Sequence, residues 1–282
     1  MALVATATGS GIALPPDLSH PVGMSEAFFF HALIVAWLAL ASVTFVALRH
    51  VAAPYGRHGR RGWGPMIDSR LGWVVMEAPA AVLFAVLFLL AYKSRRAVAA
   101  PTLTDWTFLA MWEAHYLHRA FIYPFRRGGA CSRMPVSVPA LAVFFNLVNA
   151  YLNGRYLFHF SAGYAPAWLA DPRFLVGLAV FVAGYAINKR ADAVLRRLRV
   201  SSAPGYKIPH GGLYRWVSCA NYLGEIIEWL GWATATWSLA GLTFAVWTAA
   251  NLAPRALAHH RWYREQFPDY PKGRRALIPG IW

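Results

Sequence analysis

The stretch VVMEAPAAVLFAVLFLLAY, residues 74–92, is almost entirely apolar and carries a single acidic side chain, Glu77, near its start. A helix needs about 20 mostly apolar residues to cross a bilayer, so this stretch predicts a transmembrane helix. An ionisable group inside or at the edge of hydrocarbon is costly, and it usually marks a functional site. Glu77 is therefore the first candidate functional residue of the chain.

The composition extends this prediction to the whole chain. Of the 282 residues, 58% are hydrophobic and only 14% are charged, whereas soluble domains usually contain about 25% charged residues. We therefore expect an all-α polytopic membrane protein with seven transmembrane helices in one bundle, forming a single domain over residues 1–282. The apolar runs place these helices near 27–49, 71–92, 105–125, 136–153, 173–198, 212–233 and 237–258.

The charge distribution predicts the orientation of the bundle. The chain has 27 Lys and Arg against 12 Asp and Glu, but the basic residues lie between apolar runs and not on one module, so we expect no nucleic-acid partner. Most of them fall on one side of the predicted membrane, which the positive-inside rule makes cytoplasmic. Residues 1–26 are then extracytoplasmic and lack the positive start of a cleavable signal peptide. The tail, 255–282, is cytoplasmic.

The sixth predicted helix carries two carboxylates on one face. Asn221, Glu225 and Glu228 follow at i, i+4 and i+7, and carboxylates inside a membrane helix need partners or protons. Gly224 and Gly231 lie near the same side and allow a flat ligand or another helix to approach closely. The spacing leaves two interpretations open, a ligand site and a buried structural network.

The cytoplasmic end of the fifth predicted helix combines polar and basic side chains. Asn188, Asp192, Arg196 and Arg199 follow at i, i+4, i+8 and i+11. Arginine forks bind phosphate oxygens in pairs. Contact with lipid headgroups explains the arginines equally well, but headgroups do not require the amide and carboxyl groups on the same stripe.

Two further helices add to this end of the molecule. Arg255, His259 and Tyr263 follow at i, i+4 and i+8 after the seventh apolar run, and Tyr116 and Arg119 lie one turn apart in the third. The ten histidines are scattered along the chain, so we expect no metal site. The pattern predicts an enzyme that takes an anionic soluble cofactor from the cytoplasm and an apolar substrate from the lipid.

These residues also carry a resemblance to a known family. The sequence resembles the steroid 5-alpha-reductases, most closely the type 2 members and their bacterial relatives, over roughly Leu71 to Trp282. The resemblance is carried by MEAP (76–79), AHYLHRAFIYP (114–124), INKRADAVLRRLR (187–199), GYKIPHGGLYRWVSCANYLGEIIEWLGWATATWSLAG (205–241), RALAHHRWY (255–263) and FPDYPKGRRALIPGIW (267–282).

The resemblance implies NADPH-dependent reduction of the 4,5 double bond of 3-oxo-4-ene steroids such as progesterone and testosterone. It places the pair that hydrogen-bonds the 3-oxo group on Glu77 and Tyr116. Glu77 can donate to that oxygen only when protonated, a state that removal from water favours. The implied NADPH contacts are Arg119, Asn188, Asp192, Arg196, Arg199, Tyr206, Asn221, Glu225, Arg255, His259, Tyr263 and Arg274.

The sequence departs from the family in a few places. Met76 stands where type 2 members have glutamine, and Ala78 where they have leucine, so the fit near the 3-oxo group differs. The loop FRRGGACSR (125–133) does not align cleanly, and Arg126 and Arg127 receive no role.

Other functions are weaker matches. Enoyl or polyprenol reduction on the same fold changes only the substrate. An isoprenylcysteine-type methyltransferase requires an Arg-His-Pro run that this chain lacks, and a lipid transporter or receptor leaves the cytoplasmic arginines without a role. We expect a monomer, and the alanine and arginine content points to a bacterial inner membrane, although no residue distinguishes this from the endoplasmic reticulum.

Overall fold

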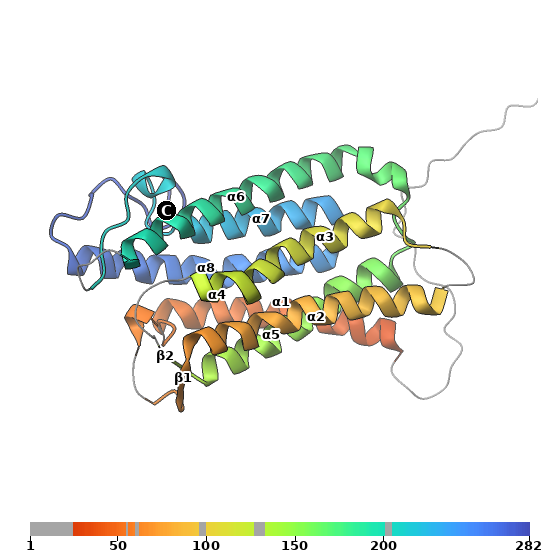
Figure 1. Ribbon diagram of the computed structural model, residues 1–282, viewed down its shortest axis with the longest axis horizontal. Helices are drawn as coiled ribbons and strands as arrows, with labels where there is room; N and C mark the ends of the chain where they lie inside the picture. The colour runs from red at the N-terminus through yellow and green to blue at the C-terminus, as the bar shows by residue number, and fades with distance from the viewer. Residues whose placement is uncertain (1–24, 55, 60–61, 96–99, 127–132, 201–204) are drawn as a thin grey trace, which may run out of the picture.

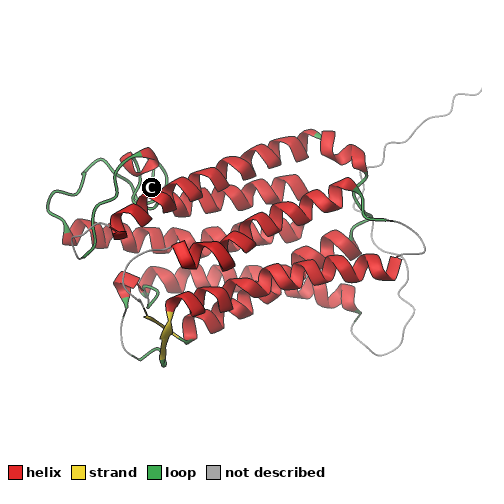
Figure 2. Cartoon of the chain, viewed as in Figure 1, coloured by secondary structure: helices red, strands yellow, loops and turns green. Residues whose placement is uncertain are grey.

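The computed structural model describes residues 25–54, 56–59, 62–95, 100–126, 133–200 and 205–282. Nearly all of the predicted segment 1–26, and Arg127, lie outside these residues. The chain folds as the all-α bundle that the sequence predicts (Figures 1 and 2). The long helices are α1 (Glu26–His50), α2 (Ser69–Arg95), α3 (Leu103–Leu117), α5 (Ser137–Arg155), α6 (Pro172–Val200), α7 (Ala220–Thr236) and α8 (Leu239–Gln266).

Short elements extend or connect these helices. The third predicted helix is composite, because α3 continues through a π-helical turn, η2 (His118–Ile122), into α4 (Tyr123–Arg126). Two three-residue strands that the sequence did not predict, β1 (Met66–Asp68) and β2 (Arg133–Pro135), pair antiparallel. The remaining single turns are η1 (Gly56–His58), η3 (Tyr156–Phe160), η4 (Pro166–Ala170) and η5 (Gly212–Arg215).

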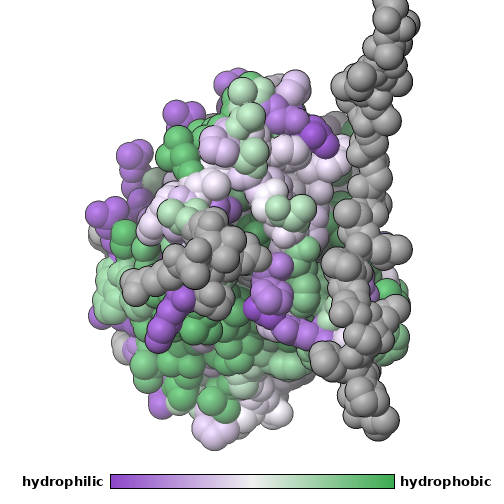
Figure 3. Space-filling model, turned by 90° about the vertical axis from the view of Figure 1, so that its right-hand side faces the viewer, coloured by the Kyte–Doolittle hydropathy of each residue, from purple (hydrophilic) through white to green (hydrophobic). Residues whose placement is uncertain are grey.

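Among the described helices, α1, α2 and α6 are long and apolar enough to cross a membrane. Large apolar side chains remain exposed on the flank of the bundle, including Val35 of α1, Leu89 of α2 and Val176 of α6. Apolar surface is also visible in the end-on view of Figure 3. Exposed apolar side chains on helices long enough to cross a membrane suit contact with lipid.

The predicted start of the sixth helix is wrong. The sequence placed it at residue 212, but α7 begins at Ala220. Gly211 and Gly212 adopt positive φ angles of 89° and 52°, which interrupt helical geometry. The intervening backbone instead pairs with the tail, where Ser218 N donates to Arg275 O at 2.9 Å.

Helices α6 and α7 pack through glycines with their backbones in contact. A Cβ atom on Gly184 of α6 would lie 2.2 Å from the Glu228 backbone nitrogen, and one on Gly231 of α7 would lie 2.2 Å from Phe181 N. Gly177 of α6 and Gly224 of α7 lie similarly close to the backbone of the facing helix. The close approach that the sequence predicted at Gly224 and Gly231 therefore serves a neighbouring helix, which holds the polar faces of α6 and α7 against each other.

The part of the tail that follows α8, residues 267–282, docks onto the start of α7 through one buried hydroxyl group. Ser218 Oγ lies 2.6 Å from His260 Nδ1 and 2.7 Å from Tyr270 Oη, and it donates to Arg275 O at 3.1 Å. Cys219 N also donates to Ala276 O at 3.2 Å. These contacts hold Arg274 at the same end of the bundle as the polar residues of α6 and α7.

Tail docking is expected to weaken at acidic pH. Burial, reinforced by Arg264 and Arg275, lowers the pKa of His260 below its ordinary value of 6.5. A histidine with a lowered folded-state pKa stabilises the fold while neutral, so this contribution is present above about pH 6.5 and is lost as the pH falls through the folded pKa.

The measurement is amide hydrogen exchange of the tail at pH 7 and pH 5. We expect the tail of the wild type to lose protection against exchange at pH 5 relative to pH 7, after correction for the intrinsic exchange rate. His260→Asn should show no such loss. His31→Asn, at an exposed position of α1, serves as the control. Identical pH profiles in the wild type and His260→Asn would show that His260 does not control docking.

Candidate active site

Arg119 lies between two carboxylates from different helices. Its Nε donates to Glu77 Oε1 of α2 at 3.2 Å, and its Nη2 lies 3.6 Å from Glu225 Oε2 of α7. The π-helical turn η2 begins one residue before Arg119, and its guanidinium also stacks 4.7 Å from the Trp73 ring. Arg119 thus connects a residue implied to contact the substrate with one implied to contact the cofactor.

Tyr116 is buried one turn before Arg119, with 3% of its surface exposed. Its hydroxyl donates to Asn146 Oδ1 at 3.4 Å and accepts from Asn149 Nδ2 at 3.4 Å. Asn146 Nδ2 in turn lies 3.5 Å from Glu77 Oε2. The predicted pair of Glu77 and Tyr116 is therefore joined through Asn146.

Sequence reasoning missed Asn146, although the sequence contains a signal for it. Asn146, Asn149 and Asn153 follow at i, i+3 and i+7 in an otherwise apolar run, and amides on one face of a membrane helix call for partners. Asn153 Nδ2 donates to Asn149 Oδ1 at 3.1 Å. The three amides form a buried ladder beside Tyr116.

Glu228 does not join the other polar residues of α7. It pairs with His115 of α3, with Oε1 2.7 Å from Nδ1, and both side chains are almost fully buried. This is the structural network that the sequence left open as the second interpretation of the α7 carboxylates, and it applies to Glu228 and not to Glu225.

The structure brings Asn188, Asn221 and Glu225 together at the α6–α7 contact. Asn188 is fully buried, and its Nδ2 donates to Asn221 O at 3.0 Å and lies 3.4 Å from Glu225 Oε2. Within the described residues, Asn188 Oδ1 and Asp192 Oδ2 are buried acceptors with no hydrogen-bond partner. Buried polar atoms without partners cost about 1–3 kcal/mol each, so both suit a ligand that brings donors.

The two arginines further along α6 are not part of this contact. Arg196 is half-buried and Arg199 exposed. Neither forms a hydrogen bond or ion pair with the other predicted site residues in the part of the chain that the structure describes.

A chain of hydrogen bonds joins the predicted residues of α8. Arg255 Nη2 donates to Tyr222 Oη at 3.0 Å, and Tyr222 Oη lies 3.1 Å from His259 Nε2. His259 Nδ1 then lies 3.0 Å from His58 Nε2, with the two rings stacked. Tyr222 and His58 were not predicted.

Arg57 is a further residue that the sequence did not single out. Its guanidinium is surrounded by the rings of Tyr206, Trp262 and Tyr263 at 5.0, 4.6 and 4.4 Å, and Nη2 donates to Tyr263 Oη at 3.1 Å. In the sequence Arg57 is one of many basic residues between apolar runs. Only the fold places it against the end of α8.

In the described residues, two arginines at this end of the bundle have buried N–H groups without a hydrogen-bond partner. They are Arg57 Nη1 and the Nε and Nη1 atoms of Arg274, whose Nη2 lies 3.4 Å from His210 Nδ1. Unpaired arginine donors and the unpaired acceptors of α6 fit an elongated ligand that carries both phosphates and hydrogen-bond donors.

Comparison with known proteins identifies close relatives. Residues 132–282 match the family described as 3-oxo-5-alpha-steroid 4-dehydrogenase. The chain is 43% identical over 262 residues to the steroid 5-alpha-reductase DET2 of Gossypium hirsutum, covering 92% of this chain and 99% of the relative. It is 43% identical to the 3-oxo-5-alpha-steroid 4-dehydrogenase 1 of Bos taurus over 260 residues, covering 91% and 98%. The similarity extends beyond the region from Leu71 to Trp282.

Proposed function

The chain belongs to the steroid 5-alpha-reductase family, and on this premise we propose that it reduces the 4,5 double bond of 3-oxo-4-ene steroids with NADPH. The observation that carries the proposal is the arrangement around Arg119. It joins Glu77, one of the two residues proposed to bind the steroid, to Glu225, which lies among those proposed to bind the cofactor. A reductase requires both ligands within reach of one another.

The residues proposed for the steroid would polarise its 3-oxo group. When bound, NADPH would supply the hydride for the beta carbon of the conjugated enone, and a proton from water would then add to the alpha carbon. Negative charge builds on the 3-oxo oxygen as the hydride arrives, and a positioned donor in a water-poor site stabilises it. Tyr116 can supply that donor, with the 3-oxo oxygen replacing Asn146 Oδ1 as its acceptor.

The unpaired polar atoms support a nicotinamide dinucleotide as the cofactor. Asn188 Oδ1 and Asp192 Oδ2 can accept hydrogen bonds from its carboxamide or ribose groups, and Arg57 and Arg274 can bind its phosphates. The positive charge favours NADPH over NADH because the 2′-phosphate adds charge for the arginines to bind. The match between the site and the cofactor rests on the types of unpaired donor and acceptor atoms at this end of the bundle.

We further propose the membrane arrangement that the charge distribution predicts. The chain crosses the membrane seven times with its C-terminus in the cytoplasm, so the proposed cofactor site opens to the cytoplasm and the steroid enters from the lipid. A monomer in a bacterial inner membrane remains our prediction, although the relatives described above are from a plant and a mammal.

The decisive experiment supplies the purified full chain with NADPH and progesterone or testosterone. We expect NADPH oxidation and a product heavier by two hydrogens, identified by mass spectrometry as the 5-alpha-3-oxo steroid. NADPH binding without turnover of any 3-oxo-4-ene steroid would contradict the proposed substrate and favour an enoyl or polyprenol lipid on the same fold.

Substitution of Glu77 separates two roles that its side chain could have, namely donating a hydrogen bond to the 3-oxo oxygen and supplying a proton. Glu77 lies 3.2 Å from Arg119 and is proposed to donate a hydrogen bond to the 3-oxo oxygen. We expect Glu77→Gln to retain more steroid turnover than Glu77→Ala, because the amide can still donate to the 3-oxo oxygen. The measurement is initial rate at saturating NADPH, with cofactor affinity as the control. Equal loss in both variants would show that the proton itself is required.

A further inference from the structure

A pocket lies at the junction of α1 and α8, and its lining includes His58, which contacts His259 of the proposed cofactor site. Its volume is about 240 Å³, and its wall is formed by the last turn of α1, the η1 turn and the outer face of α8. Four basic side chains line it, namely Arg49, His50, His58 and Arg261, opposed by the carboxylate of Glu265.

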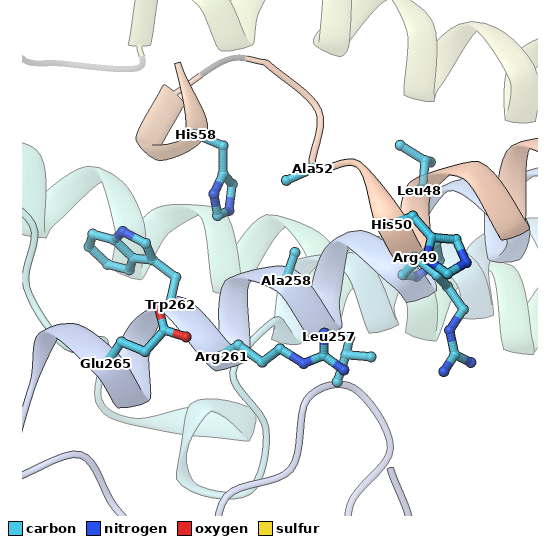
Figure 4. Close-up of a pocket in the computed structure, with 11 residues that line it drawn as sticks. Leu48, Arg49, His50, Ala52, His58, Leu257, Ala258, Arg261, Trp262 and Glu265 are labelled. Atoms are coloured by element: carbon cyan, nitrogen blue, oxygen red, sulfur yellow. The ribbon is translucent and has the colours of Figure 1, made fainter. Parts of the chain in front are cut away.

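Two guanidinium groups from different helices belong to this pocket. Arg49 comes from the end of α1, and Arg261 runs along α8 in the direction of Arg49 (Figure 4). Both are exposed, so an anion can reach them from outside the bundle. The wall between them is apolar and includes Leu257 and Ala258, which suits a ligand whose charged group is joined to an apolar part.

An exposed apolar stripe on α1 leads into the pocket. Val43 and Val46, one turn apart on α1, expose 62% and 56% of their surface. Val46 lies one turn before Arg49 on α1, so an exposed apolar side chain that suits an acyl chain is the neighbour of the basic group. Arginines at the end of a membrane helix lie at the depth of the lipid headgroups.

We propose that this pocket binds the phosphate-bearing headgroup of an anionic lipid, with Arg49 and Arg261 holding the phosphate. The acyl chains would lie along Val43 and Val46. His58 connects the pocket to the interior, because it lines the wall and also stacks on His259. The proposal does not depend on the proposed reductase activity, since it concerns binding alone.

The test measures lipid retention by the purified full chain in nanodiscs. Phosphatidylcholine nanodiscs are compared with nanodiscs containing increasing fractions of phosphatidylglycerol, and bound lipid is counted by native mass spectrometry. We expect one retained phosphatidylglycerol per chain. Arg49→Gln combined with Arg261→Gln should weaken retention by about tenfold or more, given the contribution of each basic residue near a membrane surface.

The matched control removes the same charge elsewhere at this end of the bundle. Arg197→Gln combined with Arg264→Gln changes two exposed arginines that do not line the pocket, and retention should be as in the wild type. Equal weakening in both double variants would overturn the proposal, because general surface charge would then explain it. Ala258→Leu provides a second variant, which narrows the pocket without a charge change and should also weaken retention.

The phosphate group in the pocket could come from a lipid headgroup or from free phosphate. Titration of inorganic phosphate into phosphatidylcholine nanodiscs distinguishes these two ligands. Phosphate binding that is lost in the pocket variants, without retention of phosphatidylglycerol, would support the site and identify free phosphate as its ligand. If neither phosphate nor phosphatidylglycerol distinguishes the pocket variants from the control, the site does not exist.

Discussion

Tyr116→Phe is expected to lower steroid turnover by about 100- to 1,000-fold, the usual effect of removing one donor to a developing oxyanion. The substitution removes only the hydroxyl group, and the ring keeps its packing against Trp112 and Trp229. NADPH affinity should change little, because the hydroxyl contacts the amides of Asn146 and Asn149. The measurement is turnover at saturating cofactor, together with cofactor binding.

Tyr164→Phe is the matched control. The Tyr164 hydroxyl donates to Thr236 O at 2.7 Å, where the turn that follows α7 begins, at the opposite end of that helix from Glu225. Its removal should leave turnover within a few-fold of the wild type. Turnover by Tyr116→Phe within threefold of the wild type would contradict the proposed role of Tyr116 in polarising the 3-oxo group.

Gly231→Ala is expected to destabilise the protein by more than about 3 kcal/mol, beyond the about 1–3 kcal/mol typical of an overpacked core. The added Cβ would lie 2.2 Å from Phe181 N and 2.7 Å from Gly177 O. These are backbone atoms, which cannot rotate away as a side chain can. Helices α6 and α7 would have to separate, so the loss should appear as a lower midpoint of thermal unfolding in detergent.

Gly273→Ala tests whether any added methyl group has this effect. No atom lies within 4 Å of the Cβ position at Gly273 in the tail, so we expect the unfolding midpoint of the wild type. Separation of α6 from α7 would also move Asn188 away from Glu225, and Gly231→Ala should therefore weaken NADPH binding. An unchanged unfolding midpoint in Gly231→Ala would show that the helix contact is less tight than the distances indicate.

Much of the proposed site could be predicted because helical spacing is local. Asn188 and Asp192 lie one turn apart on α6, and Asn221 and Glu225 one turn apart on α7. Each pair faces one side of its helix whatever the rest of the chain does. The structure then brings Asn188 to Asn221 and Glu225, whereas Arg196 and Arg199 continue the α6 stripe without joining them.

Residues far apart in the chain could not be paired in this way. Arg57 and Tyr263, or Asn146 and Tyr116, meet only because the helices pack together. The start of α7 was missed for a related reason, since the segment after Gly212 is apolar enough for a helix but pairs with Arg275 of the tail. Long-range backbone pairing of this kind leaves no periodic pattern in a single sequence.

By itself the sequence determined the all-α class, the approximate positions of the helices and the acid and amide residues that their faces carry. Hydrophobic length and helical period depend on neighbouring residues alone, and both can be read without knowing the fold. The tertiary structure decided which helix faces meet. Arg119 bridges Glu77 and Glu225, whereas Glu228 pairs with His115. Those choices depend on how closely the helix backbones approach, which the glycines of α6 and α7 permit and the packing of the whole bundle determines.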